Sequence, residues 1–344
     1  MTNHRSRRRR IGLAATAALG LTLATATPAY AEPTDAAHDA AASVANDTLT
    51  VIGTNASDRI ALRLAAGAPN TLQVDFDDNG SADQSFDRGT FTSINVFLLN
   101  GDDAFRVDQI NGAFADEALT IHGGNGDDDI EGGDGNETIF GDNGRDFVDG
   151  NKGHDTAFLG SGEDTFKWDP GDGSDDVDGG SGNDTMVFNG ASVNERMSLF
   201  ANGAQAVFLR DPGAVRMNMV DVEQLDVHAL GGADAITVAD TRGTDLRHTN
   251  IDLAAAGSPD NQVDTVTLNG SPQADRVRVH ARATEIDVKG LQPDVSITGS
   301  DTSETTDTPD ILNVNTLEGN DHVRVDPAAA ARIDVNVDLG AGQD

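Results

Sequence analysis

The stretch from Gly123 to Val187 divides into seven blocks of nine residues. In order the blocks read GGNGDDDIE, GGDGNETIF, GDNGRDFVD, GNKGHDTAF, LGSGEDTFK, PGDGSDDVD and GGSGNDTMV, with Trp168 and Asp169 inserted before the sixth. Every block has glycine at its fourth position, an acid at its sixth and an apolar residue at its eighth. A fixed period of this kind predicts a stack of similar structural units.

The acid at the sixth position of each block is suited to binding a hard cation. Glycine allows positive φ and leaves backbone carbonyls uncovered. Strand side chains alternate between faces, so the eighth-position residue points inward while stacked turns form outer columns of carbonyls and carboxylates. Ca²⁺ accepts about six to eight such oxygens, whereas a softer metal would favour the Cys that this chain lacks. The sixth-position acids are Asp128, Glu137, Asp146, Asp155, Asp164, Asp175 and Asp184.

The charge of this stretch also calls for a cation. Residues 123–187 include 18 Asp and Glu but only 3 Lys and Arg, so stacked turns would repel one another. The alternative is a solvated, disordered acidic linker. The nine-residue register and the apolar eighth position, which all seven blocks keep, argue against that alternative when calcium is present. Without calcium we expect disorder, because metal binding is coupled to folding.

The nonapeptide resembles the calcium-binding repeat of RTX, or haemolysin-type, proteins, G-G-x-G-x-D-x-U-x with U apolar. This resemblance implies a parallel β-roll in which calcium lies between one turn and the turn two repeats on. It pairs Asp128 with Asp146, Glu137 with Asp155, Asp146 with Asp164, Asp155 with Asp175, and Asp164 with Asp184. Glu137, Leu159 and the inserted Trp168-Asp169 depart from the family pattern, and we expect them to weaken individual sites.

The resemblance assigns candidate calcium ligands to the turns of all seven blocks. They are Gly123, Asn125, Gly126, Asp128, Gly132, Asp134, Gly135, Glu137, Gly141, Asn143, Gly144, Asp146, Gly150, Gly153, Asp155, Gly162, Asp164, Gly173, Asp175, Gly182 and Asp184.

Residues 1–31 have the three parts of a secretory signal peptide. Five arginines, Arg5 and the four of residues 7–10, precede an apolar stretch, Ile11 to Thr25, that is too short to span a bilayer comfortably. Ala29-Tyr30-Ala31 forms a cleavage site, and the adjacent arginines leave twin-arginine export open beside the general route. We therefore expect a secreted chain, cleaved after Ala31, with a flexible mature N-terminus over residues 32–46.

Charge and composition limit the partners of the chain. A formal charge of −35 excludes nucleic acid, which needs a basic face, and disfavours anionic membranes. The absence of Cys excludes disulfides, so calcium is the obvious cross-link in their place. No stretch after the signal peptide is apolar enough to cross a membrane. We expect calcium ions as ligands and a cell-surface or matrix polysaccharide or protein as a further partner.

A second, larger repeat surrounds the nonapeptides. Its copies contain VIGTNASDRI (Val51–Ile60), FNGASVNERM (Phe188–Met197) and LNGSPQADRV (Leu268–Val277), each with Gly, an acid five residues later, and then Arg. We expect these arginines to pair with neighbouring acids. They are Arg59, Arg196 and Arg276.

Each copy has a second motif further along the chain. These motifs read LLNGDDAFRVD (Leu98–Asp108), ALGGADAITVAD (Ala229–Asp240) and TLEGNDHVRVD (Thr316–Asp326). Asp103, Asp234 and Asp321 lie where the sixth-position Asp of a nonapeptide would. They form either extra calcium sites or plain strand-ending turns, and we favour the second interpretation because Gly and Asp commonly end strands.

Short β-branched runs and the lack of a helical period predict an all-β chain. The expected parts are a flexible N-terminus (32–46), a β-rich unit (47–122), the calcium-binding β-roll (123–187) and two further β-rich units (188–261 and 262–344). The β-rich units are expected to be solenoid-like, with β-sandwiches as the alternative.

The stretch DFDDNGSADQSF, Asp75 to Phe86, has two interpretations. Its acids and Asn79 are spaced as in an EF-hand loop, but Phe86 stands where that loop needs a bidentate Glu. Asn79-Gly80 is also a strong hairpin turn signal, and we favour the hairpin.

The sequence contains no catalytic motif that we recognise. There is no HExxH, no G-x-S-x-G elbow, and no glycine-rich phosphate loop, while acids are too numerous to single out a glycosidase pair. The sequence therefore favours a secreted structural, adhesive or surface-associated protein that folds on binding extracellular calcium. The alternatives are a polysaccharide-acting hydrolase and a toxin-like protein that uses the repeats as a scaffold.

Overall fold

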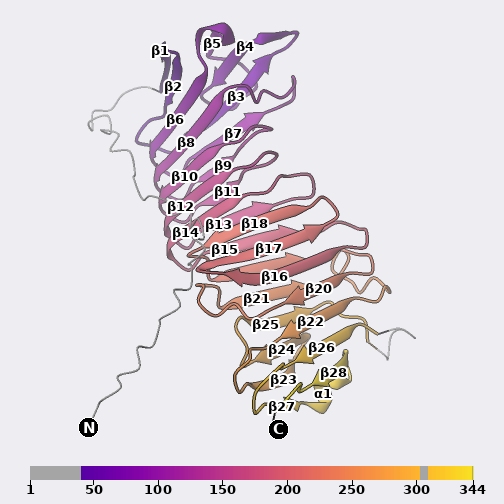
Figure 1. The fold of residues 1–344 in the computed structure, drawn as a ribbon. Coiled ribbons are helices and arrows are strands. Elements are labelled where there is room, and N and C mark those ends of the chain that lie inside the picture. The colour runs from indigo at the N-terminus through magenta and orange to yellow at the C-terminus, as the bar shows by residue number, and fades with distance from the viewer. Residues whose placement is uncertain (1–39, 303–308, 343) are drawn as a thin grey trace, which may run out of the picture. The chain divides into compact units, whose positions relative to one another are not determined.

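The computed structural model describes residues 40–302, 309–342 and 344. The expected signal peptide, residues 1–31, lies outside the described residues. The described chain forms two β-sheets, called A and B below, whose strands follow one another along a single stack (Figure 1).

Sheet A has 14 strands. In spatial order they are β1 (Ala41–Ala45), β2 (Thr48–Ile52), β6 (Ser93–Asn100), β8 (Ala118–Asn125), β10 (Thr138–Asn143), β12 (Thr156–Gly162), β14 (Asp176–Gly182), β18 (Val215–Val220), β17 (Gln205–Asp211), β16 (Arg196–Asn202), β20 (Ala235–Val238), β22 (Thr265–Asn269), β26 (Ile311–Asn315) and β28 (Asp334–Asp338).

Sheet B also has 14 strands. From the opposite end of the stack they are β27 (His322–Val325), β23 (Arg276–Arg282), β24 (Glu285–Lys289), β25 (Asp294–Thr298), β21 (His248–Asp252), β19 (Gln224–His228), β15 (Thr185–Asn189), β13 (Thr165–Trp168), β11 (Phe147–Asp149), β9 (Asp129–Glu131), β7 (Ala104–Asp108), β3 (Arg59–Ala65), β4 (Ala68–Asp75) and β5 (Gln84–Asp87). The described helices are η1 (Arg88–Thr90) and α1 (Pro327–Ala330).

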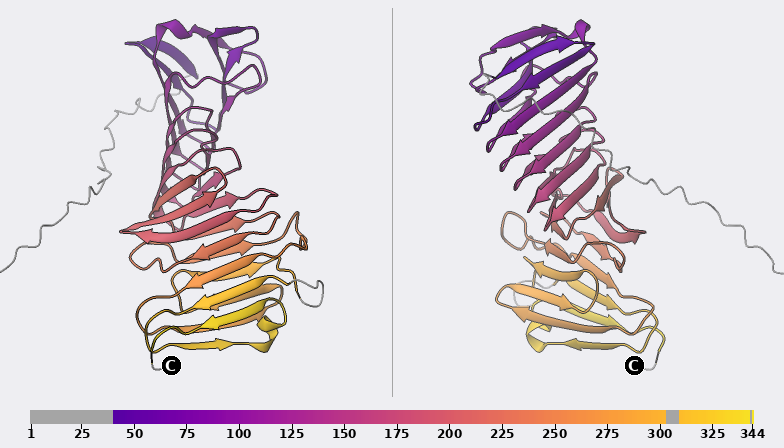
Figure 2. Two further views of the ribbon diagram at one scale, coloured as in Figure 1. Left: turned by 45° about the vertical axis from the view of Figure 1, so that its right-hand side comes forward. Right: turned by 90° about the vertical axis from the view of Figure 1, so that its left-hand side faces the viewer.

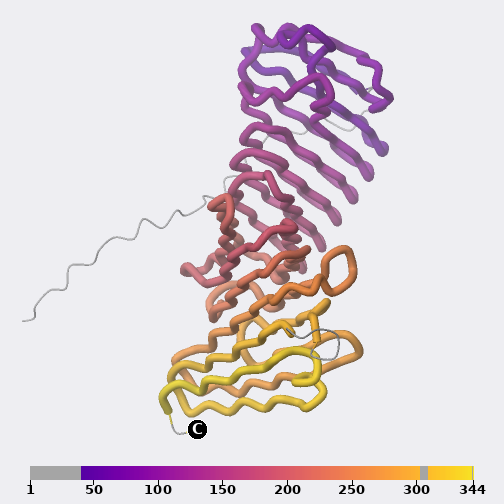
Figure 3. The backbone as a smooth tube through the Cα atoms, turned by 90° about the vertical axis from the view of Figure 1, so that its right-hand side faces the viewer, coloured from indigo at the N-terminus to yellow at the C-terminus, as the bar shows by residue number. Residues whose placement is uncertain are grey.

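The nonapeptide block forms the expected parallel β-roll. The chain alternates between the sheets from β8 to β15, and neighbouring strands within each sheet are parallel. Ile139 of β10 pairs with Ile121 of β8, and Val148 of β11 pairs with Ile130 of β9, so two nonapeptides make one full coil. The parallel coils are visible in the magenta part of the tube in Figure 3.

The core lies between the two sheets, and within the block it includes the eighth-position side chains. Each of these side chains is buried, and each of them pairs in register with its equivalent two blocks away, which confirms the expected inner ladder. Burial of each larger member contributes roughly 1.5–3 kcal/mol. The ladder consists of Ile130, Ile139, Val148, Ala157, Phe166, Val177 and Met186.

The two inserted residues are absorbed without breaking the ladder. Trp168 extends β13, pairs with Phe188 of β15 and is fully buried. Its ring stacks on Phe188 with centroids 4.2 Å apart, and its indole N–H donates to the Gly173 carbonyl oxygen at 2.9 Å. The insertion is therefore accommodated by a longer β13, whose last side chain is buried in the core.

The flanking repeats continue the same two sheets and do not form separate sandwiches. Each copy of the larger repeat begins a three-stranded antiparallel meander: β3–β4–β5 in sheet B, β16–β17–β18 in sheet A, and β23–β24–β25 in sheet B. In the second and third meanders, the last strand lies nearest the preceding coils, as the labels of Figure 1 show. Figure 2 shows how these strands face the opposite sheet at the orange and yellow end of the described chain.

The expected flexible N-terminus is wrong for residues 41–45. These residues form β1, which pairs antiparallel with β2 at the edge of sheet A. Ala42 and Val44, which alternate along the strand, pack against the core. This short alternation of apolar residues is sufficient to add a strand to the edge of sheet A. Residues 32–39 lie outside the described part of the chain.

Candidate calcium-binding turns

The block turns lie along the two edges of the stack. Along one edge they lead from sheet A to sheet B and end at Asp128, Asp146, Asp164 and Asp184. Along the other edge they lead from sheet B to sheet A and end at Glu137, Asp155 and Asp175.

A hydrogen-bond ladder connects the sixth-position acids along each edge. In every step, the backbone N–H of one acid donates to Oδ1 of the acid in the next turn. The steps are Asp128 to Asp146 (2.9 Å), Asp146 to Asp164 (2.8 Å), Asp164 to Asp184 (2.9 Å), Glu137 to Asp155 (2.8 Å) and Asp155 to Asp175 (2.9 Å). The structure therefore brings together all five expected pairs, including the two that span the insertion.

The second carboxylate oxygen is left without a partner in most of these acids. Oδ2 is buried and accepts no hydrogen bond in Asp128, Asp146, Asp155, Asp164 and Asp184. A buried charged oxygen without a partner is costly. The atom without a partner is Oδ2 of the sixth-position acid in each case, and this regular arrangement is the one expected of metal ligands.

The first-position glycine leaves an open space beside this oxygen. A Cβ added to Gly123 would lie 2.5 Å from Asp128 Oδ2 and 2.7 Å from the carbonyl oxygen of Gly141 in the next turn. A Cβ added to Gly141 would lie 2.6 Å from Asp146 Oδ2 and 2.4 Å from the Leu159 carbonyl oxygen. Carboxylate and carbonyl oxygens of two turns thus face one space that no side chain fills, and this donor set fits Ca²⁺.

Burial raises the pKa of these carboxyl groups, and neighbouring acids raise it further against the opposing effect of the backbone hydrogen bond. The pKa rises to about 9 for Asp155, about 8 for Asp146, about 7 for Asp175 and Asp184, and about 6 for Asp128. A row of ionised carboxylates is therefore unfavourable here unless a cation neutralises it.

Two carboxylates alone do not complete a calcium site. Among the described residues, no three or more His, Cys, Asp or Glu side chains converge on a metal position. Because Ca²⁺ takes about six to eight oxygens, backbone carbonyls must supply the remainder. This requirement explains why the glycines matter as much as the acids.

A parallel β-roll with paired carboxylates and open carbonyls at its turns defines a calcium-binding nonapeptide solenoid. Residues 120–136, 131–166 and 171–186 match the family model described as RTX calcium-binding nonapeptide repeat (4 copies). The chain therefore contains RTX-type calcium-binding nonapeptide repeats. No curated protein matches the chain. Within the described residues, no helix is both long and apolar enough to traverse a bilayer.

The remaining candidate ligands have different environments. The amide of Asn143 donates to Asn125 Oδ1 at 3.1 Å, and Asn125 donates to Asn100 Oδ1 at 2.7 Å, so the third-position amides form a ladder. Asp134 instead pairs with Lys152 at 3.2 Å. Side chains at this position thus bind one another, and their contribution to a calcium site would come through the backbone.

Glu137 differs from the other block acids. One of its oxygens, Oε2, accepts the Gly133 N–H at 2.9 Å, so the longer side chain returns to its own turn. On the opposite edge of the stack, Glu223 accepts the Asp184 N–H at 2.9 Å and so extends the ladder of Asp128, Asp146, Asp164 and Asp184. The sequence analysis did not predict a role for Glu223.

The turns that open two of the larger repeats satisfy their acids internally. Thr54 donates its backbone N–H to Asp58 Oδ2 at 2.5 Å and its hydroxyl to Oδ1 at 3.1 Å. Ser271 donates its N–H to Asp275 Oδ2 at 2.8 Å and its hydroxyl to Oδ1 at 3.0 Å. Both oxygens of each carboxylate therefore have donors from the same turn.

The third of these turns uses a guanidinium group. Arg210 of β17 is buried and donates through Nε and Nη2 to Glu195 Oε1, while the Ala191 N–H donates to Oε2 at 2.9 Å. The Arg210 guanidinium also lies 5.2 Å from the centre of the Trp168 ring. A side chain of the protein thus supplies the positive charge at this turn.

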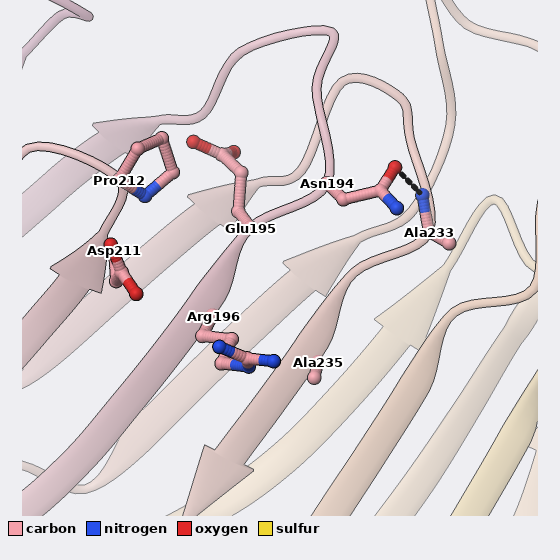
Figure 4. A pocket seen from close by; sticks show the side chains of 7 residues that line it. All are labelled: Asn194, Glu195, Arg196, Asp211, Pro212, Ala233 and Ala235. Carbon is pink, nitrogen blue, oxygen red and sulfur yellow. Dashed lines mark hydrogen bonds between the residues drawn. The ribbon is translucent and has the colours of Figure 1, made fainter.

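A hollow of about 340 Å³ lies beside this turn (Figure 4). Asn194 and Glu195 come from the turn, and the Asn194 side chain accepts the Ala233 N–H at 3.0 Å. The Glu195 carboxylate that borders the hollow is bound to Arg210, so it is not free to act as a general acid or base.

The loop after Asp75 is a hairpin, as the favoured interpretation predicted. β4 and β5 pair antiparallel on either side of it. The Asp75 carboxylate is buried, pairs with Arg63 at 2.9 Å and accepts the Gly80 N–H at 2.8 Å. Burial raises its pKa, but the Arg63 and backbone hydrogen bonds outweigh burial, and the pKa is lowered overall.

The expected pairing of Arg59, Arg196 and Arg276 with acids is wrong. Each begins a strand with its side chain exposed, and none forms an ion pair with another described residue. Arg63 and Arg210, which lie further along the meanders, instead neutralise the buried acids Asp75 and Glu195. Arg210 follows the buried Ala206 and Phe208 with period two. The alternation of side chains along a strand could therefore have indicated from the sequence that Arg210 points inward.

Proposed function

We propose that the chain is exported and that its solenoid forms when extracellular calcium binds the nonapeptide turns, giving a structural, adhesive or surface-associated protein. The observation that carries this proposal is the buried row of Oδ2 atoms without partners in the block. Calcium bound there would neutralise the acids and connect each turn to the next.

Folding and calcium binding are expected to be coupled. Without a cation, carboxylates from adjacent turns lie within one stack and burial disfavours their charge. The core lies between the two sheets, and no disulfide supports it. A metal that binds only the folded state contributes its binding free energy to folding.

Export provides the calcium. Extracellular modules bind Ca²⁺ with dissociation constants of about 10⁻⁴–10⁻³ M, so such turns stay empty in the cytosol and fill outside. The signal peptide expected over residues 1–31 is consistent with this route. The chain would then complete its folding after export.

A structural role agrees better with the hollow beside Glu195 than a hydrolase does. A glycosidase needs two free carboxyl groups that face one cleft. The Glu195 carboxylate beside the described hollow is bound to Arg210, and the block acids are buried within the ladder. The proposed role therefore depends on shape and on calcium rather than on a reaction.

The test is a Ca²⁺ titration of residues 32–344 followed by far-UV circular dichroism, with Mg²⁺ as the ion control. The test variant changes Asp128, Asp146 and Asp164 to Ala. The matched control changes the exposed acids Asp129, Glu131 and Glu163 to Ala, which removes the same charge from the same block.

We expect Ca²⁺ to produce a cooperative gain of β signal in the wild type and the control. The test variant should need at least about tenfold more Ca²⁺, because each lost carboxylate removes a charged ligand. A chain that is fully folded in chelator would refute calcium-driven folding.

A further inference from the structure

Three turns outside the matched nonapeptides share the acid geometry of the block. They end in Asp103, Asp234 and Asp321, whose side chains are only 2%, 2% and 4% exposed. In each, Oδ1 accepts the N–H of the acid in the preceding turn, at 2.7 Å from Asp58, 2.8 Å from Glu195 and 2.7 Å from Asp275. In each, Oδ2 is buried and has no hydrogen-bond partner.

The turn that ends in Asp103 continues the ladder of the block without a break. Asp103 donates its N–H to Asp128 Oδ1 at 2.8 Å, as Asp128 does to Asp146 Oδ1 at 2.9 Å. The Gly101 N–H donates to the Asn125 carbonyl oxygen at 2.8 Å, and the corresponding bond of the next turn measures 2.9 Å. The two turns are therefore equivalent in structure, although only the second belongs to the nonapeptide block.

The other two turns have the same onward connection. Asp234 donates its N–H to Asp264 Oδ1 at 2.8 Å, and Asp321 donates its N–H to Asp344 Oδ1 at 2.8 Å. Each orphaned oxygen is thus followed by a second carboxylate in the next turn, as in the block.

An orphaned oxygen is not a general property of turns in this fold. The turns that end in Asp58, Glu195 and Asp275 have the same place in a coil, yet Thr54, Arg210 and Ser271 satisfy their acids. Where the protein supplies no donor, the sixth-position Asp is buried with one free oxygen.

The backbone of the three turns is also held in the conformation of a calcium turn. Leu99, Leu230 and Leu317, at the second position, have φ of 84°, 67° and 67°, where the block has Gly124 at 105°. Positive φ is a genuine outlier for a bulky residue. The same turn is retained although leucine is unfavourable in it.

We propose that Asp103, Asp234 and Asp321 each ligate a further Ca²⁺, shared with Asp128, Asp264 and Asp344 of the following turns. These ions would connect the flanking coils as the block ions connect the nonapeptides. This inference concerns ions outside the block and stands whether or not calcium drives folding of the whole chain. It replaces the interpretation of the three motifs as plain strand-ending turns.

The first test counts bound ions in the calcium-loaded full chain by native mass spectrometry. Asp103→Asn, Asp234→Asn and Asp321→Asn keep the hydrogen-bond acceptor but remove the charge, and each should bind one ion fewer than the wild type. Asp58→Asn is the matched control, and it should bind as many ions as the wild type. Unchanged counts in all three test variants would overturn the proposal.

The second test needs no variant. Crystals of the calcium-loaded chain, measured at long wavelength, should show an anomalous peak about 2.3–2.6 Å from Oδ2 of Asp103, Asp234 and Asp321. Peaks in the block but at none of these three atoms would overturn the inference. Peaks at these atoms but not in the block would support it and count against the proposed function.

Discussion

The turns that end in Asp146 and Asp275 place the same carboxylate at the same point of a coil but satisfy it differently. Asp146 has a free, buried Oδ2, whereas both oxygens of Asp275 accept hydrogen bonds from Ser271. Under the proposed function, one turn depends on an ion from solution and the other is complete in itself. Dependence on calcium would then be a property of single turns, set by whether a donor is present at the second position or on a neighbouring strand.

The largest expected effect is on the response of the block to pH. The folded-state pKa of Asp146 is about 8 and that of Asp155 about 9, both above the unfolded value of about 4. Between these limits the folded chain binds more protons than the unfolded chain, so calcium-free stability rises as pH falls from about 9 towards 4.

Protons should therefore replace calcium in part. We expect the calcium-free chain to gain β signal in far-UV circular dichroism as pH is lowered from 9 to 5. The Ca²⁺ midpoint should rise as pH falls, because each pH unit below the pKa reduces the ionised fraction about tenfold. A calcium-free chain that loses β signal over this range would contradict the role of buried carboxyl groups.

Arg210→Ala tests the turn that carries its own cation. It leaves the Glu195 carboxylate buried and unpaired, which should cost about 3–5 kcal/mol of unfolding free energy. Urea unfolding in saturating Ca²⁺ measures the loss. Arg196→Ala is the control from the same turn, since Arg196 is exposed. A loss as small as that of the control would show that Arg210 does not neutralise this turn.

Ser271→Ala tests the turn that is closed by a hydroxyl. It removes a hydrogen bond to the Asp275 carboxylate, and we expect a loss of about 1.5 kcal/mol. Ser181→Ala, an exposed change in a block turn, should alter stability by less than about 0.5 kcal/mol. The measurement is the same urea unfolding, and equal effects of the two changes would remove the distinction between the two kinds of turn.

Leu317→Asn tests the smallest effect, the positive φ at the second position. Asn tolerates this conformation better than Leu, so a gain of about 0.5–1 kcal/mol is expected. Leu317 is 44% exposed, so little burial is lost. Val193→Asn is the control, because Val193 is similarly exposed and its φ is not positive. A thermal melt that shows no gain, or the same gain in the control, would contradict the argument.

The sequence predicted the block well because its information is local and periodic. Alternation placed Ile130 and Val148 inward, and the resemblance to the RTX repeat implied the pairing of Asp128 with Asp146. The hairpin after Asp75 was also predictable, since Asn79-Gly80 is a short-range turn signal. Such features depend on neighbours within a few residues or on one fixed period.

The sequence did not predict features that depend on register between distant segments. Arg210 reaches Glu195 only because β17 pairs antiparallel with β16 in one register. The sequence pattern instead predicted an ion pair for the repeated arginine next to each acid, although Arg196 is exposed to solvent. The continuity of both sheets through the flanking repeats depends on the same kind of long-range pairing.

If the chain is exported as proposed, with its N-terminus first, the strand order of the second meander has a consequence for the order of assembly. β14 gains its next neighbour in sheet A from β18, the last strand of the meander, and not from β16, the first. The coils up to β15 can therefore close as soon as Asn189 is outside, but sheet A can grow further only after Val220 has emerged. The third meander imposes the same delay on sheet B, so assembly beyond the block advances in two large steps rather than coil by coil.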